Sequence, residues 1–353
     1  MSRTILIMAG GTGGHIYPAL AVADVLRGRD WNVVWLGSRT GMEMRVVPEH
    51  GYELKTIRFG GLRGKGIVRM ALLPLNLLIA FWQSASVMFS VRPDVVLGMG
   101  GYISFPGGMM AALFLRPLVV HEQNAIAGLA NKVLAMLADR VLEAFPGTLS
   151  RAICTGNPVR QSVIDITDPK QRFSARSGCL RLLVIGGSLG SKALNETVPD
   201  ALALLPQESR PKVTHQSGRQ HLPALEAAYR NAGVDADMVA FIDDIANAYA
   251  QADLVVCRAG ATTVAELAVA GVASVLVPFP YAVDDHQTVN ARFLADNEAA
   301  VLIQQKDLTP PRLADLLVSF TRDRLAQMAS RARALGKAHA AGDVADHCMA
   351  MAG

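Results

Sequence analysis

Short runs of β-branched and aliphatic residues alternate with longer segments along the first half of the chain. The apolar runs lie at residues 4–9, 32–36, 95–97 and 118–121, and helix-length segments separate most of them. A strand, a helix and a second strand in this order form a βαβ unit, whose two strands are parallel. The first half therefore predicts a parallel sheet covered by helices.

The same alternation restarts in the second half of the chain. Apolar runs recur at residues 180–185, 238–242, 254–257, 274–277 and 300–303. Two such series predict the α/β class, with two doubly wound, Rossmann-like domains. The length agrees, because 353 residues exceed the roughly 250 to 300 at which a single core stops growing.

The expected domain boundary follows a Gly-Asn-Pro turn at residues 156–158. Beyond it lies a polar stretch at 165–178, in which the apolar periodicity fades. We place an N-terminal domain at residues 1–160 and a C-terminal domain at 161–336. The end of the chain is rich in alanine and arginine and predicts helices, and the last one, at 337–353, is expected to pack back on the first domain.

An uncharged segment at residues 70–91 is as long as the roughly 20 residues that span a bilayer. Polar residues interrupt it, and Asn76, Gln83 and Ser90 recur every seven residues, which gives a helix a narrow polar stripe beside a broad apolar face. The basic residues just ahead of the segment are Arg63, Lys65 and Arg69. Three interpretations stay open: a buried core helix, a helix lying on an anionic membrane surface, or a true span.

Composition adds weaker limits. Hydrophobic residues make up 51% of the chain and charged residues 18%, which suggests that some apolar surface meets something other than the protein's own interior. The net charge of +4 favours acidic partners only weakly. The cysteines are Cys154, Cys179, Cys257 and Cys348. They form no C-x-x-C pair, so neither a zinc site nor a disulfide framework is expected, and a reducing cytoplasm fits. The first apolar run is too short for a signal peptide, and we interpret it as a strand.

Three glycine-rich turns follow predicted strands. They lie at residues 10–15, 98–102 and 186–191. Glycines let the backbone approach a phosphate closely, and the N–H groups at a helix N-terminus supply hydrogen-bond donors. Any one of these turns could instead serve tight packing alone. Together they indicate more than one phosphorylated ligand.

A dinucleotide cofactor fits these turns poorly. The G-x-G-x-x-G fingerprint fails in each of them, because Ile16 and Ile103 take the place of its last glycine and Leu189 that of its second. The second strand also ends without the acidic residue that would hold an NAD ribose. Arg39 leaves an NADP-dependent reductase open.

Polar side chains gather where predicted strands end, which is the edge at which open α/β sheets bind ligands. The clusters lie at residues 121–124, 156–160, 215–218, 241–244 and 258–266. In the last of these, Glu266 comes about one turn into a helix, where a carboxylate can accept both hydroxyls of a ribose. Each cluster alone could be a helix cap or a surface group. The acidic group at 284–287 could bind sugar hydroxyls and is a weak metal site.

Taken together, these motifs resemble the MurG family of bacterial transferases. The matching segments are GGTGGH at 10–15, GMGGY at 98–102, HEQN at 121–124, GNPVR at 156–160, FIDD at 241–244 and the turn at 260–266. They span nearly the whole chain in order. The resemblance implies a glycosyltransferase of the B type, whose two domains face a cleft. It also implies transfer of N-acetylglucosamine from UDP-N-acetylglucosamine to lipid I, which gives lipid II in the synthesis of peptidoglycan. By the same resemblance the protein binds peripherally to the cytoplasmic face of the inner membrane, on an anionic surface. Neither a metal, a cofactor beyond the substrate nor nucleic acid is expected.

The resemblance also assigns residues to the two substrates. For the donor, it implies Ser188 and Arg160 at the diphosphate, the main chain of Ile242 at the uracil, Glu266 at the ribose, Asn124 and Gln287 at the sugar, and the helix start at Ala261, Thr262, Thr263, Val264 and Ala265. Thr12, Gly13 and Gly14 are expected at the reaction centre, and Gly13, Gly14, Gly100, Gly101 and Tyr102 at the acceptor pyrophosphate. The chain departs from the common pattern of the family at Thr262, Ala265 and His286, where leucine, serine and glutamine are usual.

His15 is the candidate general base. Inversion by direct displacement requires a group that takes the proton of the acceptor hydroxyl, and the ordinary pKa of histidine, about 6.5, suits that task near neutrality. His15 could instead bind a phosphate or cap its helix. For the protein as a whole, a UDP-N-acetylglucosamine 2-epimerase, an NADP-dependent reductase and a non-catalytic nucleotide-sugar sensor also remain open.

Overall fold

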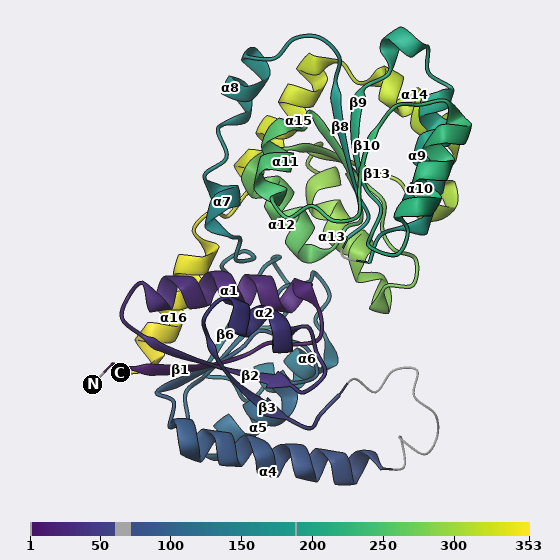
Figure 1. The fold of residues 1–353 in the computed structure, drawn as a ribbon. Helices are drawn as coiled ribbons and strands as arrows, with labels where there is room; N and C mark the ends of the chain where they lie inside the picture. The colour runs from purple at the N-terminus through teal and green to yellow at the C-terminus, as the bar shows by residue number, and fades with distance from the viewer. Residues whose placement is uncertain (1, 61–71, 188) are drawn as a thin grey trace. The chain divides into compact units, whose positions relative to one another are not determined.

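The structure is a computed structural model that describes residues 2–60, 72–187 and 189–353. The chain divides into two compact units, shown in Figure 1. Unit 1 comprises residues 1–160 and 338–353, and unit 2 comprises residues 161–337. Each unit is built on a sheet of its own.

Unit 1 contains a seven-stranded sheet in the order β3-β2-β1-β4-β5-β6-β7, and all of its strand pairs are parallel. The strands are β1 (Thr4–Met8), β2 (Asn32–Ser38), β3 (Glu53–Ile57), β4 (Val95–Gly98), β5 (Leu118–Glu122), β6 (Arg140–Glu143) and β7 (Ile153–Cys154). The order 3-2-1-4-5-6 is that of a doubly wound nucleotide-binding fold, so this prediction is confirmed. Strands β1, β4 and β5 are neighbours, and the loops that follow them therefore emerge side by side.

Helices cover both faces of this sheet, as Figure 1 shows. They are α1 (Gly13–Arg27), α2 (Glu43–Glu49), α4 (Leu73–Val91), α5 (Ser104–Leu113), α6 (Leu129–Ala135) and α16 (Ala340–Met351). Helices α1, α2 and α16 share one core with the sheet, whereas α4, α5 and α6 share the core on the opposite face. The C-terminal helix α16 thus packs on unit 1, where Val344, Ala345 and Cys348 are buried.

Unit 2 repeats the pattern with six parallel strands in the order β10-β9-β8-β11-β12-β13. The strands are β8 (Arg181–Ile185), β9 (Lys212–Gln216), β10 (Asp237–Val239), β11 (Leu254–Cys257), β12 (Ala273–Leu276) and β13 (Ala300–Leu302). The helices are α7 (Gln161–Ile164), α8 (Pro169–Ser174), α9 (Lys192–Ala203), α10 (Leu222–Ala232), α11 (Ile245–Gln251), α12 (Ala261–Ala270), α13 (His286–Ala295), α14 (Pro310–Ser319) and α15 (Arg322–Leu335), with 3₁₀ turns at Gln207–Ser209, Val283–Asp285 and Gln305–Asp307. In Figure 1, α9, α10 and α14 lie on one side of the strands and α11, α12 and α15 on the other.

Several expected element boundaries differ from the structure. The apolar runs did not include β3 or β6, because β3 carries Glu53 and Lys55 and β6 begins with Arg140 and ends with Glu143. Strand β10 ends at Val239, not at 242, since it is the edge strand and leaves its partner there. Helix α1 begins at Gly13, inside the first glycine turn. Glycine is a poor helix former, so its two helical glycines hid the first turn from a propensity argument.

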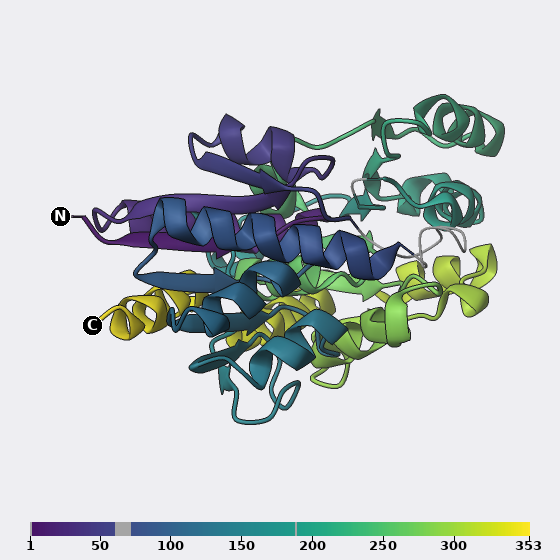
Figure 2. The same ribbon diagram turned by 90° about the horizontal axis from the view of Figure 1, so that it is seen from below.

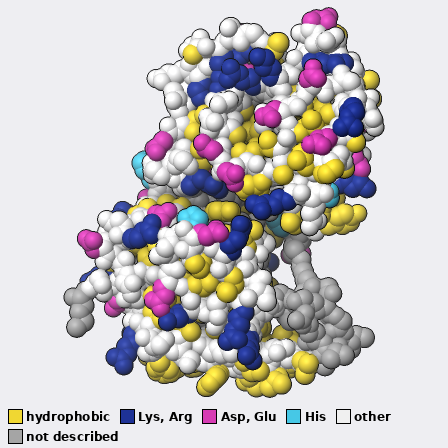
Figure 3. All heavy atoms as spheres, in the orientation of Figure 1, with side chains coloured by type: hydrophobic (Ala, Val, Ile, Leu, Met, Phe, Trp, Pro, Cys, Tyr) yellow, Lys and Arg dark blue, Asp and Glu magenta, His cyan; other side chains and the backbone are white. Residues whose placement is uncertain are grey.

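Helix α4 exposes much of its apolar surface. Ala80, Ser84 and Met88, spaced four residues apart, form its buried face. On the other side, Trp82 is 73% exposed and Phe89 is 65% exposed. In Figure 1, α4 lies along the lower edge of unit 1, and Figure 2, seen from below, shows it in front of the strands. Figure 3, in the orientation of Figure 1, shows apolar side chains along that lower edge. By length and composition alone, α4 is the one helix in the described residues that is long enough to cross a membrane, with a mean hydropathy of 1.3.

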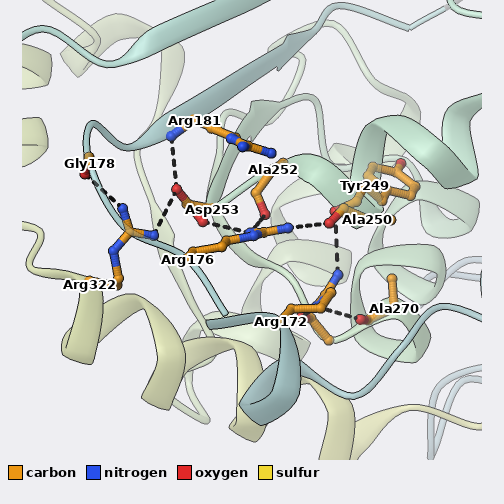
Figure 4. Close-up of polar contacts among 11 residues, drawn as sticks. Arg172, Arg176, Gly178, Arg181, Tyr249, Ala250, Ala252, Asp253, Ala270 and Arg322 are labelled. Atoms are coloured by element: carbon orange, nitrogen blue, oxygen red, sulfur yellow. Dashed lines mark hydrogen bonds and ion pairs between the residues drawn. The ribbon is translucent and has the colours of Figure 1, made fainter. Parts of the chain in front are cut away.

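The polar stretch after the boundary is tied to unit 2 through Asp253, which lies just before β11 (Figure 4). Its carboxylate accepts a hydrogen bond from Arg176 at 2.6 Å, another from the main-chain N–H of Arg181 at 2.9 Å and a third from Arg322 at 3.3 Å. Close by, Arg172 donates to the carbonyls of Ala270 and Gly271. These guanidinium groups lie at the amino ends of the strands, so they support the fold at the edge opposite the expected ligand sites.

Candidate functional site

In unit 1, a buried carboxylate holds the first glycine turn. Glu43 accepts the N–H of Gly11 at 3.1 Å, and its other oxygen accepts the N–H and the hydroxyl of Ser38 at 2.9 and 2.7 Å. Sequence reasoning missed Glu43, because nothing in its local pattern separates it from an ordinary acidic residue at a helix start. The Gly11 amide is thus engaged within the fold. The donors of the turn that lie at the helix N-terminus belong to Gly13 and Gly14, behind the exposed Thr12.

The first two glycine turns interlock. A Cβ on Gly101 would lie 2.3 Å from the carbonyl oxygen of Gly10, and one on Gly100 would lie 2.8 Å from Nδ1 of His15. Both glycines also have positive φ angles, of +82° and +89°, which side chains rarely adopt. The ring of Tyr102 lies beside Gly11, and its hydroxyl donates to Ser38 at 3.1 Å. These glycines serve close packing, and the pyrophosphate role of this turn stays a prediction.

His15 is connected to the end of β5 by a chain of short contacts. Its Nδ1 lies 2.8 Å from Oε1 of Gln123, and Nε2 of Gln123 lies 3.0 Å from Nδ1 of His121. Nε2 of His121 lies 2.9 Å from the carbonyl oxygen of Gly156. His121 is fully buried, and desolvation lowers its pKa to about 4. Sequence reasoning placed Gln123 in the HEQN cluster but gave it no role.

Asn124 is oriented by its neighbour Glu122. The buried carboxylate of Glu122 accepts the main-chain N–H of Asn124 at 2.9 Å and its side-chain amide at 3.3 Å. The same carboxylate accepts the N–H of Gly128 and the amide of Asn131. The guanidinium of Arg160 lies 4.9 Å from the centre of the Tyr17 ring. Unit 1 therefore places Asn124 on a rigid support at the carboxyl end of the sheet.

In unit 2, the third glycine turn follows β8 and leads into α9. Gly190 has φ +79°, and a Cβ there would lie 2.0 Å from the carbonyl oxygen of Ser217. Gln216 donates to the carbonyl of Gly187 at 2.9 Å. The hydroxyl of Ser191 caps α9. Ser188, the expected diphosphate residue of this turn, lies outside the described residues.

A second buried histidine, His215, supports this turn through a chain of hydrogen bonds. His215 contacts the hydroxyl of Tyr229 through Nδ1 at 2.9 Å and Oδ1 of Asn195 through Nε2 at 3.1 Å. Asn195 in turn donates to the carbonyl of Ser217 at 3.0 Å. Burial lowers the pKa of His215 to about 3, so the ring is neutral. The sequence placed His215 at a strand end but gave no sign of Tyr229 or Asn195.

The remaining donor candidates lie after β10, β11 and β12. Glu266 is buried, and the hydroxyl of Tyr249 donates to it at 3.3 Å. Oε1 of Gln287 accepts the N–H groups of Ala259 and Phe279 at 3.2 and 2.9 Å, which joins two strand ends to α13. At the start of α12, Ala261 and Val264 are buried, whereas Thr262, Thr263 and Ala265 are partly exposed. The side chain of Val264 is therefore core, and a ligand would meet main chain there. Ile242 is partly exposed just beyond β10.

The described residues hold no group of three or more histidine, cysteine, aspartate or glutamate side chains that could bind a metal. In the acidic segment at 284–287, Asp285 accepts a hydrogen bond from the hydroxyl of Thr288 at 2.7 Å. The structure thus brings His15, Gly100 and Gln123 together in unit 1, and separately gathers the turn at 186–191, Glu266 and Gln287 at the strand ends of unit 2.

Comparison with known families matches both units. Residues 5–143 match the Glycosyltransferase family 28 N-terminal domain, and residues 181–347 match its C-terminal domain. The chain is 60% identical over 355 residues to a UDP-N-acetylglucosamine–N-acetylmuramyl-(pentapeptide) pyrophosphoryl-undecaprenol N-acetylglucosamine transferase of Ralstonia nicotianae, covering 100% of this chain and 97% of the relative. A transferase of the same name from Aromatoleum aromaticum is 60% identical over 350 residues, covering 99% and 98%.

Solved structures agree with this match. The structure of Acinetobacter baumannii MurG has a TM-score of 0.86 and 40% identity, with 99% of each chain covered. A UDP-GlcNAc 2-epimerase from Neisseria meningitidis has a TM-score of 0.67 at 11% identity, with 99% of this chain and 100% of the epimerase covered. At that identity, the likeness to the epimerase concerns the fold alone.

Proposed function

The chain belongs to the MurG family of N-acetylglucosaminyltransferases, and from this membership we propose that it moves N-acetylglucosamine from UDP-N-acetylglucosamine to the 4-hydroxyl of the muramoyl sugar of lipid I. The product is lipid II, the disaccharide precursor of peptidoglycan. The observation that carries the proposal is the match to named transferases at 60% identity along the whole chain. An epimerase needs no acceptor and shares only the fold with this chain.

The donor is assigned to unit 2. The turn at 186–191 opens onto the N-terminus of α9, where main-chain N–H groups and the helix dipole favour the diphosphate. Glu266, near the start of α12, would accept the ribose hydroxyls, and Gln287 would bind the sugar through its amide nitrogen, because its oxygen already accepts two main-chain N–H groups. The resemblance also assigns Arg160 and Asn124 to the donor.

The acceptor is assigned to unit 1, with His15 as the general base. In the reaction, the 4-hydroxyl oxygen attacks the anomeric carbon while the bond from that carbon to the UDP oxygen breaks. The hydroxyl proton goes to Nε2 of His15, and the negative charge leaves with UDP. Attack from the face opposite UDP inverts the anomeric centre. A positioned base contributes about 10²- to 10⁴-fold to such a step.

The test replaces His15 by alanine and measures turnover with a lipid I analogue and UDP-N-acetylglucosamine binding separately. Loss of the base should lower kcat by about 10²- to 10⁴-fold. The donor Kd should stay within about twofold, because the donor contacts are assigned to other residues. Unchanged turnover would remove His15 from the chemistry. Failure of the wild type to release UDP on addition of the lipid would remove the transferase function itself.

A lipid acceptor requires contact with a membrane, and the exposed side of α4 is the proposed surface. Its apolar members are Leu75, Leu78, Trp82 and Phe89, and the exposed Leu115 lies two residues beyond the end of the adjoining α5. Such a face can lie in the interface of a bilayer and bind peripherally. The expected location is the cytoplasmic face of the inner membrane. Vesicle sedimentation of the wild type and of Trp82→Glu tests it, since a charge at that position should reduce binding to anionic vesicles.

A further inference from the structure

Gln123 stands between two histidines, and its contacts decide which way round its amide lies. The side-chain nitrogen of Gln123 lies 3.1 Å from the main-chain carbonyl oxygen of His121. A carbonyl oxygen only accepts hydrogen bonds, so the group facing it has to be the amide NH₂. The amide oxygen of Gln123 therefore faces His15, at 2.8 Å from Nδ1.

The proton on His121 follows from the same reasoning. Its Nε2 faces the carbonyl oxygen of Gly156 at 2.9 Å and so carries the hydrogen. Its Nδ1 faces the NH₂ of Gln123 at 3.0 Å and so accepts. A second proton on the ring would meet an N–H donor, and full burial also holds the pKa of His121 down at about 4. His121 is therefore neutral and fixed as a single tautomer.

These two steps give the hydrogen bonds one direction. Gln123 donates to His121 and accepts from His15, so Nδ1 of His15 carries the hydrogen. A neutral imidazole has only one N–H, and the hydrogen bond at one nitrogen decides the state of the other. We propose that Gln123 and His121 are positioning residues that hold neutral His15 with its proton on Nδ1, so that the lone pair on Nε2 is presented as the base. This inference rests on the proposed function.

Gly100 makes room for this arrangement. Its missing Cβ would lie 2.8 Å from Nδ1 of His15 and 3.2 Å from Oε1 of Gln123, directly at the hydrogen bond that joins them. The second glycine turn thus leaves the space that the hydrogen bond between His15 and Gln123 requires. The contacts come from the ends of β4 and β5 and from the start of α1, which are neighbouring elements of unit 1. These elements hold the imidazole in place on its Nδ1 side.

The test is a two-bond proton–nitrogen NMR spectrum of the full chain labelled with ¹⁵N-histidine. The chain has 8 histidines, and the signals of His15 are identified by their loss in His15→Gln. At about pH 8.5, two units above the ordinary histidine pKa, the spectrum should show His15 protonated at Nδ1. In Gln123→Met, which keeps the length but has no amide, the Nδ1–H form should give way to the Nε2–H form.

Kinetics of the same variants separate positioning from packing. Gln123→Met should lower kcat by about 10- to 100-fold, the size of effect found when a partner that orients a metal-binding histidine is lost. The donor Kd should stay within about twofold. Gln123→Glu retains an oxygen toward His15 and should recover the Nδ1–H form, but its second oxygen replaces the NH₂ that faces His121, so only part of the lost kcat should return. Gln216→Met is the matched control, because this glutamine also holds a glycine turn but faces no histidine; it should leave the His15 spectrum unchanged.

Two outcomes would overturn the inference: a His15 that carries its proton on Nε2 in the wild type, or a Gln123→Met protein that retains both the Nδ1–H form and wild-type kcat. The NMR result does not depend on which reaction the protein performs. An Nδ1–H His15 whose replacement by alanine leaves turnover intact would instead contradict the proposed base, so the two failures are distinguishable.

Discussion

The first glycine turn of each unit is held by a side chain, but the turn of unit 1 donates the hydrogen bond and the turn of unit 2 accepts it. In unit 1, the turn gives its Gly11 N–H to the carboxylate of Glu43. In unit 2, the turn offers its Gly187 carbonyl to the amide of Gln216. The carboxylate of Glu43 takes up the Gly11 N–H of the first turn, whereas the amide of Gln216 binds a carbonyl of the second turn and not one of its N–H groups. The comparison favours the unit 2 turn as the diphosphate site and makes the unit 1 turn a mount for His15.

Each turn also rests on a buried, neutral histidine, but the two chains of hydrogen bonds end differently. In unit 2, the chain runs from Tyr229 through His215 and Asn195 to the carbonyl of Ser217, which cannot exchange a proton. In unit 1, the chain ends on the imidazole of His15, which can. A chain of hydrogen bonds through a buried histidine therefore supports the backbone in unit 2 and sets the tautomer of His15 in unit 1.

The largest expected effect is the loss of folding stability that the two buried, neutral histidines, His215 and His121, cause as the pH falls. The folded pKa of His215 is about 3, below the ordinary 6.5, so its contribution to stability is fully present above pH 6.5. As the pH falls below 6.5, the unfolded chain takes up a proton that the folded ring refuses, and stability falls by about 1.4 kcal/mol per pH unit until about pH 3. His121 acts alike, down to about pH 4.

Urea unfolding of the wild type and of His215→Gln, followed by circular dichroism, measures this loss for unit 2. Between about pH 7.5 and 4.5 the wild type should lose about 3 kcal/mol more than the variant. The tryptophans are Trp31, Trp35 and Trp82, and all lie in unit 1, so their fluorescence is the internal control and should not respond to the substitution. Parallel curves for the two proteins would contradict the assignment of a neutral, buried His215.

Glu43→Gln should break the charged support of the first turn. The glutamine turns an NH₂ toward at least one N–H that the carboxylate accepted, which leaves a buried donor unpaired and costs about 2 to 3 kcal/mol. Tryptophan fluorescence during urea unfolding reads this loss in unit 1. Gln216→Met, which removes the neutral support of the unit 2 turn, should leave the fluorescence transition in place. An equal shift of that transition by both variants would mean that the turns are not supported separately.

The sequence predicted the elements that follow a repeating pattern, but not the contacts between residues that are far apart along the chain. Alternating apolar runs predicted both doubly wound units, and the glycine turns and strand-end clusters predicted where polar groups gather. The roles of Glu43 and Gln123 could not be predicted, because each depends on a partner more than 30 residues away and has no periodicity of its own. Glycine is ambiguous for a similar reason: Gly100 fits a phosphate turn, yet its neighbour in the fold is His15.

Gly100→Ala should displace His15 from Gln123 and lower kcat by about 30-fold, or about 2 kcal/mol of transition-state stabilisation. The matched control is Gly147→Ala, in the same unit, which has a similar φ of +82° but open space around its Cβ position. Both variants should lose some stability because alanine is strained at a positive φ, but only Gly100→Ala should change turnover. If Gly100 instead served the acceptor pyrophosphate, the KM for lipid I would rise while kcat stayed level.

Tyr229→Phe should have the smallest effect and marks the limit of the comparison. The phenylalanine fits the same space but leaves Nδ1 of the buried His215 without its donor, which costs about 1 to 2 kcal/mol of unit 2 stability. Because this chain of hydrogen bonds ends on the backbone, kcat at saturating donor should stay within about twofold, in contrast to Gln123→Met. Urea unfolding by circular dichroism and steady-state turnover provide both numbers. A loss of kcat comparable to that of Gln123→Met would show that the unit 2 histidine also acts on the reaction. The chain of hydrogen bonds in unit 2 would then do more than support the backbone, and it would no longer differ in role from the chain in unit 1.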